Sequence, residues 1–373
     1  MRIVYTILGT FNSGGMERVL ANKANYLSTR GYDVSIVTTD QKNRKSFFEL
    51  DSSIKLYDLG INYTDDLHKG ILTRGISYLN KQKKHKKNLK DLLFRIKPEI
   101  AISMFDNDAN FITDIDDGSK KVLEIHFSRF KRLQYGRKGI WNIIDSYRNK
   151  ADLKTVGKFD HFIVLTEEDK GYWGDLPNIQ VIPNANSFES ETSSPLLNKS
   201  VIAIGRFDYQ KGFDDLIKSW SIVQKSRPDW KLNIYGHGPL ERELKNLITS
   251  LNLTDSVQLH APTKDIKSVY LNHSILAMTS RYEGLPMVLL EGQVCGLPMV
   301  SYACKCGPKD IITNGKNGFL VDEGNKEDFA EKLMILMSDE AQRINMGKES
   351  FANSKNFSEH KVMEQWIKLF KSL

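Results

Sequence analysis

The sequence predicts an α/β protein made of two similar halves. With 373 residues, the chain is long enough for two domains of ordinary size. Residues 2–39 read as a strand, a glycine-rich loop, a helix and a second strand, and residues 201–223 begin the same order again. A strand, a crossover helix and a second strand form the unit from which Rossmann-like sheets are built. We therefore expect two Rossmann-like domains.

The first half opens with a strand at residues 2–8, a helix at residues 16–30 and a strand at residues 34–39. Apolar side chains at helical spacing and a terminal glycine mark the helix: Leu20, Ala24, Leu27 and Gly31. The loop at residues 9–15 therefore follows the carboxyl end of the first strand, where open α/β sheets bind ligands.

Further elements are placed by apolar runs and helical spacing. Buried strands are expected at residues 99–104, 121–125, 161–165, 232–235, 257–260 and 275–278. Residues 67–94 have a long helical pattern, which the basic run at residues 81–87 interrupts. Residues 185–199 are rich in Ser, Asn, Thr and Glu, so they are the best candidate for an interdomain linker.

The composition is that of a soluble globular protein, with 40% apolar and 27% charged residues. No segment approaches the run of about 18 apolar residues that indicates a membrane-spanning helix, and the apolar start of the chain is too short for a signal peptide. Three cysteines, an odd number gathered late in the chain, favour free thiols in a reducing compartment: Cys295, Cys304 and Cys306. We therefore expect a cytoplasmic protein.

The basic excess lies entirely in the first half. Residues 1–184 hold 30 Lys and Arg against 23 Asp and Glu, which leaves +7, whereas residues 185–373 hold 23 of each. The basic run at residues 81–87 stands beside apolar residues, and residues 127–147 interleave basic with aromatic side chains. Both segments permit peripheral docking on an anionic membrane. Nucleic acid is not expected as a partner, because no recognised binding module accompanies the charge.

Residues 280–291 contain two glutamates that sit near the start of a helix. Glu283 lies in a loop after an apolar strand, Glu291 lies about two turns further on, and Pro286 falls in the first helical turn. If all the steps between the glutamates were helical, their backbones would lie about 12 Å apart, whereas the two carboxyls of a glycosidase stand roughly 5 to 9.5 Å apart. A hydrolase is therefore disfavoured, although a loop that folds back would shorten the gap.

The start of this helix is suited to bind an anion. Free backbone amides at Gly284, Leu285 and Met287 and the positive end of the helix dipole attract phosphate. Each carboxylate accepts hydrogen bonds from sugar hydroxyls. A nucleotide sugar combines phosphates with sugars on both sides. A second segment fits the same ligand, because Arg206 and Lys211 flank a short loop after another strand, where cations neutralise a diphosphate.

These motifs resemble those of retaining glycosyltransferases of family 4, which have the GT-B fold. Glu283 to Glu291 resembles the family's E-x7-E signature, residues 205–212 its G-R-x-x-x-x-K-G element, and Gly14-Gly15 its glycine-rich loop. The resemblance implies two Rossmann-like domains that face a central cleft. It places an acceptor-side domain at residues 1–184, a nucleotide-sugar-binding domain at residues 185–356, and a terminal helix at residues 357–373 that packs back on the first domain.

The resemblance also implies roles for individual residues. It assigns catalytic roles to Glu283, His126, Arg206 and Lys211. It assigns donor binding to Gly14, Gly15, Arg206, Lys211, Gly284, Leu285, Met287 and Glu291. Glu283 would hold the donor sugar and Glu291 the ribose, whereas His126 follows a strand and could equally be a packing residue.

The function implied by the resemblance is transfer of a sugar, with retention at the anomeric carbon, from a UDP-linked donor. The donor sugar would be a hexose or an N-acetylhexosamine, and the acceptor a glycan or lipid-linked glycan of bacterial surface polysaccharides such as capsule or lipopolysaccharide. No metal or other cofactor is expected. A non-catalytic nucleotide-sugar-binding protein or membrane scaffold of the same fold remains the main alternative.

Three other interpretations of individual motifs stay open. Asp40 follows the second strand, where a dehydrogenase has its ribose-binding acid, but the G-x-G-x-x-G motif is absent. Asp106 and Asp108 have the D-x-D form that other glycosyltransferase folds use for metal. A glycogen-synthase-like enzyme usually has a lysine before the glycine pair, where this chain has Asn12 and Ser13.

Overall fold

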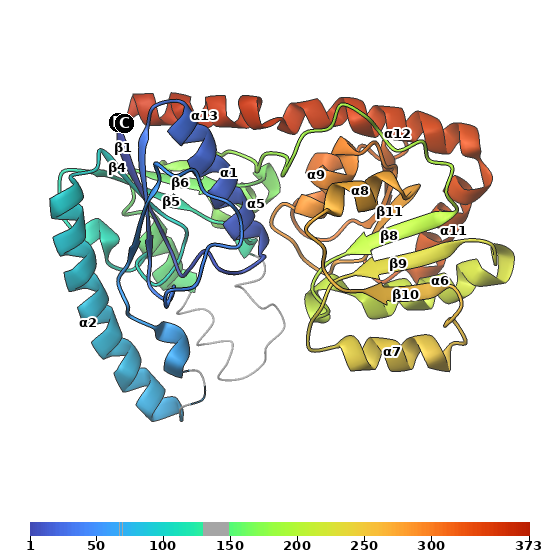
Figure 1. Cartoon of the computed structure of the whole chain (residues 1–373), viewed down its shortest axis with the longest axis horizontal. Coiled ribbons are helices and arrows are strands. Elements are labelled where there is room, and N and C mark those ends of the chain that lie inside the picture. Colours follow the sequence, from blue (N-terminus) through green and yellow to red (C-terminus); the bar gives the residue numbers. More distant parts are fainter. Residues whose placement is uncertain (67, 69, 130–148) are drawn as a thin grey trace. The chain divides into compact units, whose positions relative to one another are not determined.

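The computed structural model describes residues 1–66, 68, 70–129 and 149–373. The chain divides into two compact units, one of Met1–Ile182 with Met363–Leu373 and one of Pro183–Val362. Each unit contains one sheet with helices packed around it (Figure 1). The strand pairs of both sheets are parallel. The predicted α/β class is confirmed.

The first unit has a seven-stranded sheet of order β3-β2-β1-β4-β5-β6-β7. Its strands are β1 Arg2–Ile7, β2 Asp33–Thr38, β3 Lys55–Asp58, β4 Ile100–Ser103, β5 Lys120–Glu124, β6 His161–Val164 and β7 Ile179–Val181. The helices that lie wholly within its described residues are α1 Gly15–Thr29, α2 Ile71–Ile96 and α5 Glu167–Trp173, with short 3-10 turns at Tyr63–Asp66 and Ile112–Asp114. Residues 149–156 are also helical. The strand order reverses between β1 and β4, so the loops after these two strands flank a topological switch point.

Helix α2 differs from its prediction in one respect. We expected the basic run at residues 81–87 to interrupt the helix, but α2 continues through it from Ile71 to Ile96. Lysine is a good helix former when its head group reaches water. His85, in the middle of the run, is buried and packs edge-on against Phe111. One side of the basic run therefore faces the interior of the protein.

The second unit has a six-stranded sheet of order β10-β9-β8-β11-β12-β13. Its strands are β8 Ser200–Ile204, β9 Lys231–Tyr235, β10 Val257–His260, β11 Ile275–Met278, β12 Met299–Tyr302 and β13 Gly318–Val321. Its helices are α6 Phe213–Ser226, α7 Glu241–Ser250, α8 Ile266–Leu271, α9 Met287–Val294, α10 Pro308–Ile311, α11 Lys326–Ser338 and α12 Glu340–Ser354, with 3-10 turns at Tyr209–Lys211 and Lys355–Phe357. The last helix, α13 Glu359–Ser372, ends in the first unit.

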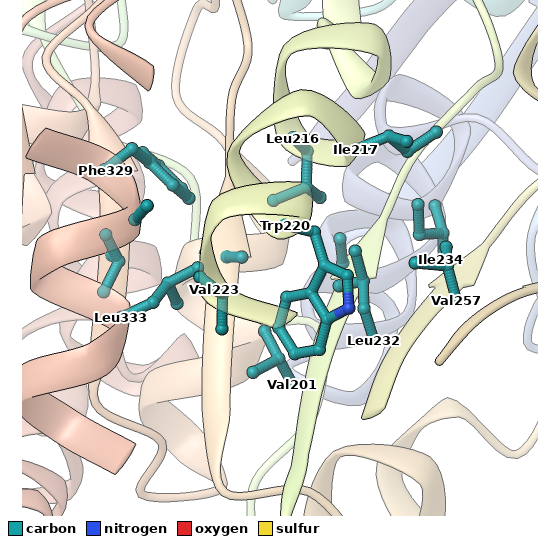
Figure 2. Packing of buried hydrophobic residues seen from close by; sticks show 14 of the residues in the cluster. Val201, Leu216, Ile217, Trp220, Val223, Leu232, Ile234, Val257, Phe329 and Leu333 are labelled. Atoms are coloured by element: carbon teal, nitrogen blue, oxygen red, sulfur yellow. The ribbon is translucent and has the colours of Figure 1, made fainter. Parts of the chain in front are cut away.

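The core of the second unit explains why α6 forms where it does. Apolar residues recur at helical spacing along α6 and are buried: Phe213, Leu216, Ile217, Trp220 and Val223. Figure 2 shows the indole of Trp220 pointing from the helix toward Val201 and Leu232 on the strands. Its Nε1–H donates to Ser256 Oγ at 3.2 Å, so the buried polar atom is satisfied.

The expected linker is an irregular segment that packs on the second unit. Residues 185–199 contain no helix or strand. Asn186 N donates to Phe357 O at 2.8 Å, and Ser194 Oγ donates to His273 O at 2.6 Å. The unit boundary itself falls between Ile182 and Pro183.

Candidate functional site

Two loops meet at the switch point of the second sheet. Strand β8 lies between β9 and β11, so the loop after β8, residues 205–212, is next to the loop after β11, residues 279–286. Hydrogen bonds join them: Arg281 N donates to Gln210 O at 2.8 Å, and Thr279 Oγ1 donates to Gly212 O at 2.9 Å. The crevice outside the carboxyl ends of strands at such a point is where doubly wound sheets bind ligands.

Gly212 permits this close approach. Its φ is +60°, and a Cβ at this position would lie 2.2 Å from Thr279 O. Only glycine satisfies both the left-handed backbone and the absence of space. Gly205 has a related role, because the aliphatic part of Lys211 packs closely over it, and a Cβ at this position would lie only 3.0 Å from Lys211 Cδ.

Lys211 and Glu283 form an ion pair across the two loops. Lys211 Nζ lies 2.6 Å from Glu283 Oε1, and the other carboxylate oxygen accepts from Gln210 Nε2 at 3.5 Å. Glu283 is almost fully buried, whereas Lys211 is one-fifth exposed. The structure therefore brings together two residues that the sequence motifs placed far apart in the chain. It also leaves the lysine partly accessible to a ligand.

The start of α9 presents unused backbone donors. In the described part of the chain, the amides of Gly284, Leu285 and Met287 donate to no acceptor, as expected from the sequence. Pro286 is the N-cap of α9 and not a residue of its first turn as predicted, because its φ of −72° and ψ of 107° are extended. Its carbonyl accepts the first hydrogen bond, from Leu289 N at 3.0 Å.

Arg206 and Glu291 complete the predicted residues of this unit. Arg206 is the most exposed of them, with 69% of its side chain accessible, and its Nε donates to Asp208 Oδ2 at 2.8 Å. Glu291 is buried in α9 and accepts a hydrogen bond from Tyr270 Oη at 2.9 Å. The Arg206 guanidinium is therefore free to turn toward a ligand, whereas the carboxylate of Glu291 is held in place.

Arg281 is a supporting residue that the sequence analysis missed. Its Nη2 donates to both carboxylate oxygens of Asp214 at 2.9 and 3.0 Å, and its Nη1 donates to Tyr209 O at 2.6 Å. It thereby ties the loop that carries Glu283 to the loop that carries Lys211. Two sequence features could have revealed it. Arg281 lies two residues before Glu283, and α6 begins with the paired acids Asp214 and Asp215, which suit an arginine partner.

The predicted residues of the first unit lie at the carboxyl edge of its own sheet. Gly14 is the N-cap of α1, Gly15 is the first residue of α1, and His126 follows β5. A Cβ on Gly14 would lie 2.3 Å from Glu17 Oε2, so glycine lets the Glu17 carboxylate fold back over the turn. Burial raises the pKa of Glu17, while Asn12 and His126 lower it in part.

The three aspartates of this edge have internal partners. Asp40 Oδ1 accepts from Thr64 N and Oγ1 at 2.8 and 2.7 Å, and its Oδ2 accepts from Thr39 Oγ1 at 2.9 Å, so both carboxylate oxygens have partners within the protein. Asp108 accepts from Thr6 Oγ1 at 2.6 Å, and Asp106 accepts from Asn107 N at 2.7 Å. Within the described ranges, no group of three or more His, Cys, Asp or Glu side chains could hold a metal ion.

The basic and aromatic segment predicted at residues 127–147 lies only partly within the described residues. Of the basic and aromatic residues expected at residues 127–147, those from 130 onward lie outside the described residues. The three cysteines, all described, are buried and form no disulfide bond. None of the helices that the structure describes combines the length and apolar character needed to cross a bilayer.

Comparison with known proteins identifies the class. A family model for glycosyl transferases group 1 matches residues 188–353. An uncharacterized glycosyltransferase of Haemophilus influenzae is 30% identical over 378 residues, which are 98% of both chains. The GalNAc-alpha-(1->4)-GalNAc-alpha-(1->3)-diNAcBac-PP-undecaprenol alpha-1,4-N-acetyl-D-galactosaminyltransferase of Campylobacter jejuni is 27% identical over 368 residues, which are 97% of this chain and 96% of its own.

A solved structure agrees with this class. A mutant of S. aureus TarM, in complex with fondaparinux, alpha-GlcNAc-glycerol and UDP, matches with a TM-score of 0.78 at 18% identity over 99% of both chains. The fold is that of the GT-B glycosyltransferases, which confirms the predicted fold. The chain belongs to the group 1 glycosyltransferases, and it is a glycosyltransferase enzyme.

Proposed function

We propose that the chain is a retaining glycosyltransferase that moves a hexose or N-acetylhexosamine from a UDP-linked donor to a glycan or lipid-linked glycan in polysaccharide biosynthesis. The Campylobacter relative is named for a lipid-linked acceptor, and the S. aureus structure contains UDP. Both names support this choice of donor and acceptor class.

The proposal rests on one observation. Lys211 is partly accessible, and it lies near the start of α9, where backbone amides donate to no acceptor in the described part of the chain. A diphosphate leaving group gains negative charge as its bond to the sugar breaks. Fixed cations and amide donors around the group stabilise that charge, which is usually the largest single contribution to catalysis. Lys211, the Arg206 guanidinium and the amides that precede and open α9 supply these groups without a metal ion.

The state of Glu283 supports binding of the sugar over nucleophilic attack on it. One oxygen is paired with Lys211 and the other faces Gln210, so the carboxylate is already stabilised and is a poor nucleophile. In the proposed step the acceptor oxygen bonds to the anomeric carbon on the face that the phosphate leaves. The bond between that carbon and the phosphate oxygen breaks, and the departing phosphate takes the acceptor proton.

A thermal-shift screen of the full chain against UDP-, GDP- and ADP-sugars tests the donor class. We expect the midpoint of unfolding to rise most with UDP-sugars, because a ligand that binds only the folded state stabilises it. An equal response to all three, or none, contradicts the proposed donor. Assay of the product by NMR then tests retention, since the anomeric proton reports the configuration of the new bond.

We also propose that the enzyme works at the cytoplasmic face of an anionic membrane, through the exposed face of α2. Residues on that face recur every three or four positions and therefore form one stripe: Ile76, Leu79, Lys83, Lys87, Lys90 and Phe94. Ile76 and Leu79 are 65% and 62% exposed. Lysines between exposed apolar side chains complement anionic headgroups and the acyl boundary beneath them.

Liposome flotation tests this surface. We expect the chain to float with vesicles of mixed anionic and zwitterionic lipid and not with zwitterionic vesicles alone. A Lys83→Glu, Lys87→Glu, Lys90→Glu variant should lose flotation. The matched control changes three exposed lysines of the second unit, Lys225→Glu, Lys316→Glu and Lys348→Glu, and should float like the wild type. Equal flotation of both variants contradicts the assignment to α2.

A further inference from the structure

A buried charged cluster in the first unit is not explained by the fold alone. Lys23 of α1 extends its ammonium to the Glu124 carboxylate at the end of β5, with Nζ 2.7 and 2.6 Å from the two oxygens. Both side chains are almost completely buried. Trp366 of α13 covers the ammonium, with Nζ 3.4 Å from the ring centroid, so three elements converge on one charge pair.

His126 is the third member of this cluster. Its Nε2 lies 3.0 Å from Glu124 Oε1. The angle of this contact is outside that of a hydrogen bond, and neither ring nitrogen of His126 has another partner in the described part of the chain. A buried imidazole that faces a carboxylate and leaves Nδ1 unused is arranged to receive a ligand.

A buried ion pair is weak support for stability by itself. Desolvation offsets most of the attraction, and apolar residues of similar volume often replace such pairs without loss. Glu124 of this pair lies two residues before His126, which is a predicted site residue. This position indicates a role for the pair other than stability.

We infer that Lys23, Glu124 and Trp366 are positioning residues that fix the orientation and tautomer of His126 toward a bound sugar. The inference rests on the proposed function, because it takes His126 to contact a sugar of the transfer reaction. An ionised carboxylate only accepts hydrogen bonds, so a small turn of the ring lets Glu124 accept from Nε2–H at the observed separation of 3.0 Å. Glu124 then favours the tautomer with hydrogen on Nε2. Nδ1 is then the acceptor for a sugar hydroxyl. Lys23 balances the carboxylate, and Trp366 holds Lys23 in place.

The ionisation state of Glu124 agrees with this arrangement. Burial alone would raise the pKa of Glu124, but the Lys23 ammonium beside the carboxylate lowers it, and the pKa of Glu124 lies below its usual value. The carboxylate is therefore charged throughout the range in which an enzyme is assayed. It acts as a hydrogen-bond acceptor and not as a proton donor.

NMR of protein labelled with 15N in histidine tests the tautomer directly. We expect the imidazole of His126, assigned by loss of its signal in His126→Gln, to carry a proton on Nε2 and none on Nδ1. In the double variant Lys23→Met, Glu124→Gln the signal should become a mixture of tautomers. The double variant removes both charges and keeps the shape, so no unpaired charge is left to prevent folding. A proton on Nδ1 in the wild type, or an unchanged signal in the double variant, overturns the inference.

Kinetics separate positioning from a structural role. The double variant should fold and yet lose about 10- to 100-fold in kcat, by analogy with the loss seen when the partners that orient metal-binding histidines are removed. The matched control, Lys121→Met with Asp117→Asn, removes another buried ion pair at the other end of β5 and should keep its kcat. Equal kcat for both double variants makes the Lys23 pair purely structural and overturns the inference. If the enzyme uses no donor at all, the proposed function is wrong. The NMR result still shows whether Glu124 and Lys23 set the tautomer of His126.

Discussion

Nζ of Lys211 lies 2.6 Å from Oε1 of Glu283, so a cation from one loop and a carboxylate from another share the switch point of the second sheet. The pair lies next to the unused amides at the start of α9. A bound diphosphate would share the Lys211 ammonium with Glu283, and the carboxylate, still paired, would accept hydroxyls of the donor sugar with its remaining lone pairs.

The first prediction concerns the two cations. Lys211→Ala and Arg206→Ala should each lower kcat by about 100- to 1000-fold, as the loss of one charge-stabilising donor does. Arg206 is largely exposed, so its variant should unfold at the same temperature as the wild type. Steady-state assays and thermal melts check both statements. Arg242→Ala, an exposed arginine of α7, serves as the control, and equal rates for all three variants would refute the assignment.

The second prediction concerns the backbone that joins the two loops. Gly212→Ala forces a side chain into a left-handed position and against Thr279 O, so it should lower the free energy of unfolding by about 2 to 4 kcal/mol. Gly315→Ala has the same backbone problem, with φ of +79°, but open space around its Cβ. It should cost about 1 kcal/mol. Chemical denaturation measures the difference, and equal losses would show that the contact with Thr279 contributes nothing.

The third prediction is a pH dependence. Burial and the carboxylates of Asp108 and Asp40 raise the pKa of Asp106 to about 7, although Asn107 lowers it in part. The folded state therefore holds this proton more tightly than the unfolded chain, whose aspartates titrate near pH 4. The stabilisation is complete below about pH 4 and is lost as the pH rises through 7.

Replacing the carboxyl with an amide removes this loss. Asp106→Asn should gain stability relative to the wild type between pH 4 and pH 8, by an amount on the order of 3 kcal/mol. Asp114→Asn should show the opposite trend, because Lys86 lowers the pKa of Asp114 despite partial desolvation. Urea denaturation at both pH values is the measurement, and parallel trends in the two variants would contradict it.

The fourth prediction concerns metal. Because Lys211 and Arg206 occupy the place at which a divalent ion would neutralise the diphosphate, transfer should proceed at the same rate in EDTA as in magnesium or manganese. A rate that falls in EDTA and returns with either ion would show that a metal takes part.

The positions of the motif residues in the fold could be predicted because each motif lies in one continuous segment after a strand, whereas their roles in binding and catalysis stay predictions. Strand ends alone placed Lys211 and Glu283 at the same sheet edge. Their direct contact and the role of Arg281 depend on which strands are neighbours, which no local pattern specifies. Lys23 and Glu124 are 101 positions apart, and a lysine on an amphipathic helix is normally exposed, so the sequence has no signal for this pair.

The secondary structure shows the same difference between features with a local sequence signal and features that depend on distant segments. The strand at Val257–His260 was predicted at its observed bounds, because a short apolar run between turn residues is a local signal. The uninterrupted course of α2 was not, since the buried position of His85 inside a basic run depends on Tyr63 and Phe111 from other segments.

The central claim is that the donor diphosphate binds at the switch point of the second sheet. A crystal structure of the enzyme with its nucleotide sugar tests it most directly. We predict diphosphate oxygens within hydrogen-bonding distance of Lys211 Nζ and of the amides of Gly284 and Leu285. A diphosphate bound at any other place, with the pair of Lys211 and Glu283 undisturbed, would contradict the claim.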